Sequence, residues 1–510
     1  PLVAAGRMPV MKGLMERGVV GSLRAEKPLL SPLIWTTMAT GKGVAEHGIA
    51  DFLVRDPASG GLVPIASTAR RVQALWTMLT AVGVRSDVVA WWATWPAERI
   101  LGTMVTDRLA YQLFKAPGES GAAGVVWPEE AWGWVKPLVV TAEGETAKEV
   151  QRVVKVSEGE VEAAWAEGGA EPRQENKLNH LRKIIAATRT YEGVAERLLG
   201  SQAACTLVYF ESTDTVGHLF GRYMPPQLAA VSAAEVETYG GALEAVYEWM
   251  DELLGRVMAR VEPGTVVVVV SDHGFYTGSL RPDSDPADFT TGAAEWHRSE
   301  GIFVAAGDGI GRADAGVVTA YDIAPTVLAL LGVPAGKDMP GKVVTAALPT
   351  GTVVRERIAS YESLPRVGAL QVARSAEADR ERMQELAALG YISPGSVPEK
   401  PAPAPAPTAA VAAMKPAQPS AAPSPAATPR SVEEVGALWN RAMSLAGAGR
   451  IEEAKREYEK AIAIAPLAGP PYESLAALYL QQGDHAGAFR VLAEGYARSL
   501  DMKPLLLTQM

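Results

Sequence analysis

The sequence predicts an α/β protein with a mostly parallel central sheet and helices on both faces, followed by a small all-α module of helical repeats. Through about residue 345, short β-rich runs alternate with longer helix-like segments, a pattern typical of crossover units in a parallel sheet. Three runs, residues 205–210, 266–270 and 302–305, are apolar throughout, as expected of strands buried on both faces. The composition changes after residue 394, and this change separates the α/β part from the helical module.

Helices are predicted where residues that start or stop helices bound helix-prone stretches. Residues 233–261 form one such stretch, and a Pro-Gly pair ends it directly before the valine run, so this helix leads into a parallel strand. Asp322 is expected to be an N-cap, with Pro325 in the first turn of a helix that continues to Leu331. Residues 374–389 are charged and helix-prone, and we expect them to pack on the core as its last helix.

The chain divides into three predicted parts. Residues 1–393 form the α/β domain, and residues 431–500 form the helical module. Residues 394–430 are mostly Pro, Ala and Ser, so this segment cannot bury enough surface to fold and acts as a semi-extended linker. Because such a linker transmits little constraint, we expect the α/β domain to stay folded when everything after residue 394 is removed.

The helical module is predicted from a self-similarity along the chain. Residues Ala442, Gly449 and Ala454 recur 34 positions later as Ala476, Gly483 and Ala488. The pattern resembles tetratricopeptide repeats, in which small residues let paired helices approach closely. Two units are fewer than the roughly three that such arrays usually need, so either a third unit is missing or the pair docks on another surface. We also expect that the repeats can bind a protein partner.

Composition and charge exclude several classes of protein. Of the 510 residues, 48% are hydrophobic and 21% charged, which is typical of a soluble globular protein. The net charge of −10 argues against binding to nucleic acids or anionic membranes. A single cysteine, Cys205, excludes an intramolecular disulfide and a thiolate zinc cage.

The sequence contains no membrane segment. Its apolar runs fall well short of the roughly 20 residues that span a bilayer, so we expect a soluble chain, with only a slight preference for the cytoplasm. The chain begins at Pro1 in what reads as a helix, which leaves a signal peptide or anchor upstream open.

Acidic and imidazole side chains follow two of the predicted strands. Asp214 and His218 lie just after the first apolar run, Asp272 and His273 directly follow the valine run, and His297 lies in a similar polar setting. In parallel α/β sheets, ligands and catalytic groups gather at the carboxyl ends of strands. A single Asp-His pair is most often a capped turn, but the joint pattern predicts a zinc-type site of carboxylate and imidazole ligands.

A nucleophile is predicted at the start of an early helix. Ser31 precedes Pro32 as an N-cap does, and the unpaired amides and dipole at a helix N-terminus favour an anion there. The alternative is that Ser31 only caps the helix. A phosphate loop is absent, because no glycine precedes Gly41-Lys42 at the required spacing.

Taken in order, these motifs resemble the type I phosphodiesterase and nucleotide pyrophosphatase branch of the alkaline phosphatase superfamily. The resemblance covers about residues 1–345 and rests on Ser31-Pro32, Thr40-Gly41-Lys42, His47-Gly48-Ile49, Asp214-x-x-x-His218, Ser271-Asp272-His273-Gly274, His297 and Asp322-Ile-Ala-Pro325-Thr326. It implies an alkaline-phosphatase-like domain that hydrolyses a small phosphoester substrate with a serine nucleophile and two divalent cations.

The same resemblance implies a role for each residue. Ser31 takes the nucleophile's place, one metal is held by Asp214, His218 and His297, and the other by Asp272 and His273, while His47 is structural. Zinc is the expected metal, with manganese or iron as alternatives.

The chain departs from the family pattern at two points. Ile34 stands where the nucleotide pyrophosphatases have an asparagine, so the substrate clamp is unassigned. The family's further metal aspartate lies on a strand upstream of Pro1, so we expect the chain as given to hold one ion well and the second weakly.

Other functions stay open at this point. The same site would serve a phosphomonoesterase or a phosphoryl or phosphoglycerol transferase, and a catalytically silent protein could use the repeats to recruit a partner. Sulfate ester hydrolysis is not expected, because the residues that follow Ser31 do not form the arylsulfatase pattern.

Overall fold

The structure is a computed structural model. It describes residues 1–56, 61–109, 123–166, 176–282, 293–372, 374–389, 391–398, 429–447, 449–464, 466, 469–482, 484, 487–488, 490–491 and 494.

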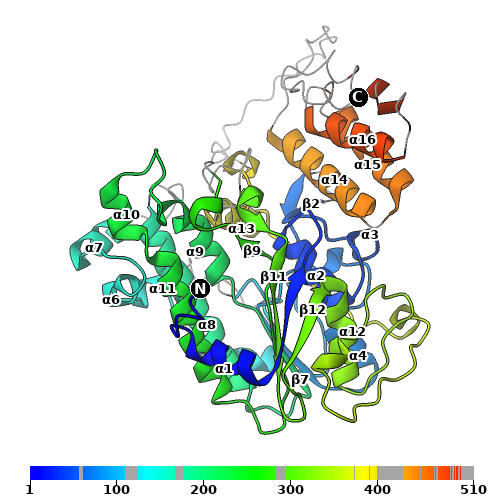
Figure 1. Ribbon diagram of the computed structural model, residues 1–510, viewed down its shortest axis with the longest axis horizontal. Helices are drawn as coiled ribbons and strands as arrows, with labels where there is room; N and C mark the ends of the chain where they lie inside the picture. The colour runs from blue at the N-terminus through cyan, green and yellow to red at the C-terminus, as the bar shows by residue number, and fades with distance from the viewer. Residues whose placement is uncertain are drawn as a thin grey trace, which may run out of the picture.

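Two four-stranded sheets form the centre of the α/β domain (Figure 1). The first has the order β12 (Ala313–Thr319), β1 (Val19–Arg24), β11 (Glu300–Ala306) and β8 (Val267–Val270). The second has the order β6 (Val126–Trp127), β5 (Met104–Val105), β4 (Ser86–Val89) and β7 (Cys205–Val208). The predicted runs at 205–210, 266–270 and 302–305 are therefore all strands.

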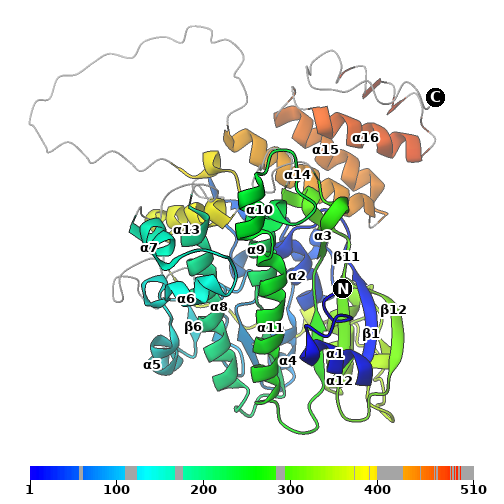
Figure 2. The same ribbon diagram turned by 60° about the vertical axis from the view of Figure 1, so that its left-hand side comes forward.

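Helices cover both faces of these sheets, which confirms the α/β fold class. On one side lie α8 (Lys177–Leu198), α9 (Ser212–Phe220) and α11 (Ala242–Met258). On the other side lie α2 (Ser31–Thr40), α4 (Leu75–Ala81) and α12 (Ala320–Leu330), and Figure 2 shows the same arrangement from a second direction. α1 (Pro9–Arg17) packs against α11 and β11.

Strand directions are more mixed than the sequence predicted. β1–β12, β4–β5 and β4–β7 pair in parallel, whereas β1–β11, β11–β8 and β5–β6 pair antiparallel. β8 pairs with β11 and not with β7, and no helix longer than a 3-10 turn lies among the described residues between β8 and β11, so the chain reverses without a crossover. The valines of β8 are only half-buried, because the strand ends its sheet.

Two helix boundaries differ from the prediction for identifiable reasons. The stretch 233–261 is divided into α10 (Ala233–Tyr239) and α11, with a Gly-Gly pair at the break. In α12 the N-cap is Thr319, and Asp322 is the third helical residue, whose Oδ2 accepts from the Thr319 backbone amide at 2.8 Å. Thr319 and Asp322 thus form a capping box. The sequence prediction took Asp322, the second residue of this box, for the N-cap.

α13 (Ala376–Leu389) is the predicted last helix of the α/β domain. Its Met383 and Leu386 side chains are buried in the main core, so this helix packs on the domain as expected.

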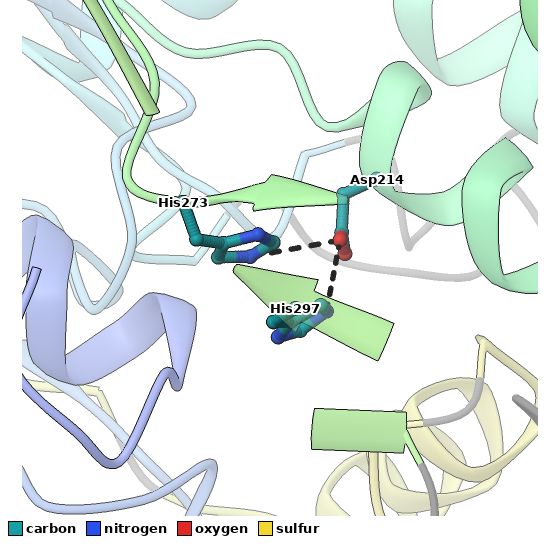
Figure 3. Close-up of side chains that lie close together, drawn as sticks. All are labelled: Asp214, His273 and His297. Carbon is teal, nitrogen blue, oxygen red and sulfur yellow. Dashed lines mark ion pairs between the residues drawn. The ribbon is translucent and has the colours of Figure 1, made fainter. Parts of the chain in front are cut away.

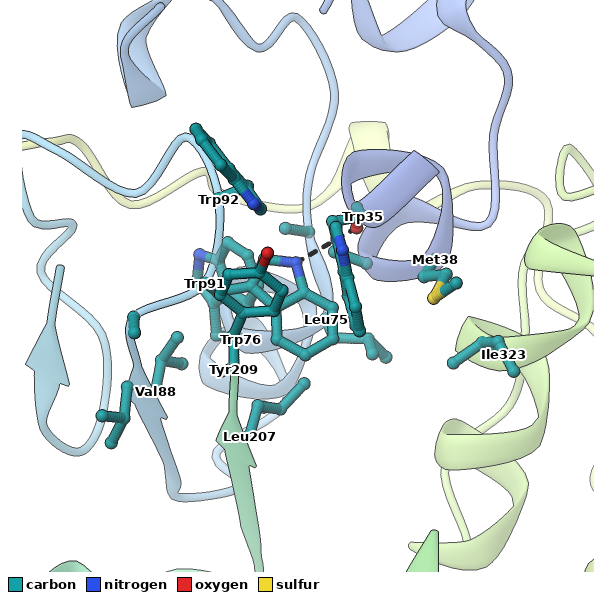
Figure 4. Close-up of a cluster of buried hydrophobic side chains, with 14 of the residues drawn as sticks. Trp35, Met38, Leu75, Trp76, Val88, Trp91, Trp92, Leu207, Tyr209 and Ile323 are labelled. Atoms are coloured by element: carbon teal, nitrogen blue, oxygen red, sulfur yellow. Dashed lines mark hydrogen bonds between the residues drawn. The ribbon is translucent and has the colours of Figure 1, made fainter. Parts of the chain in front are cut away.

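An aromatic cluster fixes the helix that carries Ser31 (Figure 4). Trp35 of α2 packs edge-on against Trp91 and Tyr209, with ring centroids 4.9 Å apart in both pairs. The Trp91 indole N–H donates to the Trp35 carbonyl at 3.1 Å. Gly41 ends the helix in the left-handed conformation, with φ +67°, which glycine adopts at little cost. The start of α2 is therefore held firmly against the ends of β4 and β7.

The helical module consists of α14 (Pro429–Gly447), α15 (Ile451–Ile464) and α16 (Gly469–Gln481). Ala442, Ala454 and Ala476 are fully buried, in keeping with small residues at close helix contacts. Gly483 lies outside the described residues, and the repeat assignment stays a prediction. The predicted linker also lies largely outside them, apart from η11 (Pro394–Ser396) and its last residues, which begin α14.

The module docks on the α/β domain. Docking on another surface was one of the two possibilities that the small number of repeats left open. α14 packs against α3 (Val44–His47), and Ala45 of α3 joins the apolar cluster of the module. Arg450 forms an ion pair with Glu46 at 2.5 Å. These contacts constrain the module more than the linker composition predicted.

Among the described residues, no helix combines the length and apolar character needed to cross a bilayer.

Candidate metal centre and nucleophile

The first two candidate ligands lie on one face of α9. The chain leaves β7 at Val208 and enters α9 at Ser212, so Asp214 is in the first turn and His218 is one turn later. Residues four apart on a helix are neighbours, and His218 Nε2 lies 3.4 Å from Asp214 Oδ1.

The other three candidate ligands come from the segment after β8. Asp272 and His273 directly follow the strand, and β9 (Gly274–Phe275) pairs antiparallel with β10 (His297–Arg298). This pairing brings His297 beside His273, with the two rings stacked at a centroid distance of 3.7 Å. Two short strands thus assemble residues that lie far apart in the sequence.

All three imidazoles converge on one carboxylate oxygen. The Nε2 atoms of His218, His273 and His297 lie 3.4, 3.6 and 3.3 Å from Asp214 Oδ1. Figure 3 shows His273 and His297 pointing toward Asp214. Asp272 Oδ2 lies 3.5 Å from His273 Nε2. The five residues therefore form one cluster, in which ligands predicted for two separate ions share neighbours.

Backbone carbonyls fix the tautomers of two of these rings. His297 Nδ1–H donates to the Leu29 carbonyl at 3.0 Å, and His273 Nδ1–H donates to the Gly274 carbonyl at 3.1 Å. In a neutral ring, each Nε2 then carries a lone pair directed at the cluster. Burial and the nearby His273 lower the pKa of His297 to about 4, so its ring is neutral near pH 7.

The cluster also sets the charge of its central carboxylate. Burial by itself raises the pKa of Asp214, but the neighbouring His218 and His297 outweigh burial and lower this pKa well below its ordinary value. Asp214 is therefore an anion in the middle of the cluster.

The donor atoms fit a divalent cation. Asp214 Oδ1, Asp272 Oδ2 and His273 Nε2 are buried and have no hydrogen-bond partner among the described residues. Ligand atoms of Asp214, His273 and His297 lie within 4.8 Å of one another. Unpaired buried polar atoms are costly, whereas imidazole nitrogen and carboxylate oxygen are the ligands that zinc prefers.

Ser31 is the first residue of α2 and not its cap. The N-cap is Leu30, and no side chain caps this end of the helix. Ser31 is 3% exposed, and the preceding loop meets the cluster through the Leu29–His297 hydrogen bond. The Ser31 hydroxyl thus does not cap the helix, which was the alternative role considered from the sequence.

Comparison with known proteins bears on this site. A model of the family described as type I phosphodiesterase / nucleotide pyrophosphatase matches residues 2–324, which include Ser31 and the five clustered residues. The chain belongs to the type I phosphodiesterase / nucleotide pyrophosphatase family.

Solved structures similar to this phosphodiesterase-family chain share little sequence with it. Phosphonoacetate hydrolase from Sinorhizobium meliloti 1021 is 18% identical, with 54% of this chain and 52% of that chain covered and a TM-score of 0.30. Human ectonucleotide pyrophosphatase / phosphodiesterase 5 is 13% identical, with 66% and 92% covered and a TM-score of 0.35. The alkaline phosphatase PafA has the same identity and TM-score, with 66% and 93% covered. The chain spans about half the length of the phosphonoacetate hydrolase.

One contact of the cluster was not predicted from the sequence. The hydroxyl of Tyr391 donates to Asp214 Oδ2 at 3.0 Å. Tyr391 lies outside the part of the chain that the phosphodiesterase family model matches. Tyr391 lies after α13, and no sequence pattern relates it to Asp214. The two residues come together only in the folded chain.

Proposed function

We propose that the protein is a metal-dependent phosphoester hydrolase that cleaves a phosphodiester or nucleotide pyrophosphate with Ser31 as nucleophile. Asp214, His218 and His297 would hold one divalent cation, and Asp272 with His273 would hold a second. Zinc suits this nitrogen and oxygen donor set, and manganese or iron are alternatives.

The observation that carries the proposal is the convergence of three imidazoles on the Asp214 carboxylate. Three imidazole rings within 3.6 Å of one buried carboxylate oxygen form an energetically costly arrangement in the absence of a ligand. The family match supports phosphoester chemistry at these residues.

The residues of the chain divide the chemistry between them. Bound cations would supply positive charge for the phosphoryl group and lower the pKa of the serine hydroxyl. Ser31 Oγ attacks phosphorus and its proton passes to solvent, while the bond from phosphorus to the leaving oxygen breaks and that oxygen takes a proton from solvent to leave as an alcohol. Water then attacks phosphorus of the serine ester, the bond to Oγ breaks, and a proton from water restores the Ser31 hydroxyl and releases the phosphoryl product.

The start of α2 assists this attack. α2 begins at Ser31, and its first backbone amides lack partners within the helix, so its positive end would stabilise a phosphoryl group on Ser31. A local site of this kind also explains how a chain with a net charge of −10 can bind an anion.

The test is turnover of a chromogenic phosphodiester by metal-loaded protein and by Ser31→Ala. We expect turnover only in the wild-type protein, with the leaving alcohol and a monoester as products. Preference for a monoester would indicate a phosphomonoesterase, and a phosphate ester of an added alcohol would indicate a transferase. Metal-loaded wild-type protein that turns over none of these substrates would contradict the proposal and favour a binding role.

A further inference from the structure

The two oxygens of the Asp214 carboxylate have different neighbours. Oδ1 faces the three imidazoles, whereas Oδ2 accepts the hydrogen bond from Tyr391 at 3.0 Å. We propose that Tyr391 is a positioning residue, which holds Asp214 so that Oδ1 is directed at the metal. This inference rests on the proposed function, because it needs a metal at the cluster.

The tyrosine ring is fixed by its packing. It stacks on Phe52 at a centroid distance of 4.7 Å and an interplanar angle of 17°, and it meets Trp92 edge-on at 5.8 Å. It also lies edge-on to His218 at 6.4 Å. Aromatic contacts of this kind leave the ring little freedom to move, so the hydroxyl is held in one position. The position of the hydroxyl is therefore set before any metal binds.

The chemistry of the phenol suits this role. Its hydroxyl donates a hydrogen bond to the carboxylate and adds no charge to the cluster. A hydrogen bond to one oxygen stops rotation of the carboxylate group and leaves the lone pairs of the other oxygen for the metal. Groups that orient metal ligands in this way typically change metal affinity by about 10–100-fold when they are removed.

Tyr391 belongs to the segment that joins α13 to the helical module. α13 is anchored in the core by Met383 and Leu386, and Tyr391 lies two residues after its end. η11 comes next and touches both α13 and α14. The segment that leads to the helical module thus completes a site whose other members lie within residues 2–324.

Tyr391→Phe isolates the hydroxyl, because phenylalanine keeps the stacked ring. The matched control is Tyr361→Phe, which removes the hydroxyl that donates to the Pro334 carbonyl at 2.6 Å, outside the cluster. Zinc affinity of metal-free protein is measured by competition with a chromophoric chelator. The absorption spectrum of the cobalt-substituted protein reports the geometry of the ligands.

We expect Tyr391→Phe to lower zinc affinity by about 10-fold or more and to change the cobalt spectrum, whereas Tyr361→Phe leaves both unchanged. The thermal midpoint of metal-free Tyr391→Phe shows whether the variant is folded. Wild-type affinity and spectrum in folded Tyr391→Phe would overturn the inference while the proposed function stands. Wild-type protein that binds neither zinc nor cobalt would overturn both.

Discussion

His297 Nδ1–H donates a hydrogen bond to the carbonyl oxygen of Leu29 at 3.0 Å. This contact joins the loop that ends two residues before Ser31 to the imidazole cluster. It also leaves the Nε2 lone pair of His297 directed at Asp214. One hydrogen bond therefore ties the loop that precedes the proposed nucleophile to a proposed metal ligand and sets the tautomer of that ligand.

Replacement of Ser31 by alanine should abolish turnover of a phosphodiester and leave the fold intact. Because Ser31 is not the cap of α2, the free energy of unfolding should change by less than about 1 kcal/mol. Zinc affinity should stay within about threefold of the wild type, because the five clustered side chains remain. Steady-state kinetics with metal-loaded protein, together with urea denaturation, check both parts. Substantial turnover by folded, metal-loaded Ser31→Ala would refute the assignment of the nucleophile.

His47 should make the protein less stable in acid. Its Nδ1 accepts from the Ile49 amide and its Nε2–H donates to the Thr37 hydroxyl, so the fold requires the neutral ring. Burial and the charges of Arg70 and Arg71 lower the pKa of His47 to about 3. The unfolded ring binds a proton below pH 6.5 and the folded ring does not, so stability falls as the pH drops from 6.5 toward 3.

The expected loss from His47 is about 2 kcal/mol between pH 7 and pH 5. Urea denaturation at several pH values measures it, and His47→Asn should lose less stability than the wild type over this range. Equal pH dependence in the two proteins would show that His47 is not responsible.

The contact between the helical module and the α/β domain can be measured at Arg450 and Glu46. Both side chains are more than a third exposed, so we expect a coupling free energy of only about 0.2–1 kcal/mol from the double-mutant cycle of alanine variants. The control cycle uses Glu453, which pairs with Arg450 inside the module at 2.7 Å. High salt should weaken both pairs. A coupling of zero between Arg450 and Glu46, with a measurable coupling to Glu453, would indicate that the module does not dock in solution.

The sequence predicted the parts of the site that depend on local spacing. Asp214 and His218 lie four apart, so one helix was sufficient to bring them together. Asp272 and His273 follow an apolar run, and the end of a strand is where such residues gather. The α/β class followed from the same alternation of strands and helices.

Other features depend on pairing between distant segments and had no sequence signal. An apolar run carries no information about the direction of its strand in the sheet, so the antiparallel pairing of β8 with β11 was not predicted. The β9–β10 pair, which brings His297 against His273, also joins segments that no sequence pattern related. Tyr391 reaches Asp214 only through the packing of α13 on the core.

Zinc titration of metal-free protein and of Asp214→Asn tests the central claim most directly. Asparagine keeps the size of the side chain but removes the charge on which three imidazoles converge. The control is Asp251→Asn, which alters a buried carboxylate that accepts from the Met11 amide at 2.8 Å.

We predict tight zinc binding by the wild type and by Asp251→Asn, and zinc affinity weakened by at least about 100-fold in Asp214→Asn, with loss of phosphodiester turnover. Equal zinc affinity in wild type and folded Asp214→Asn, or no zinc binding by the wild type, would contradict the account.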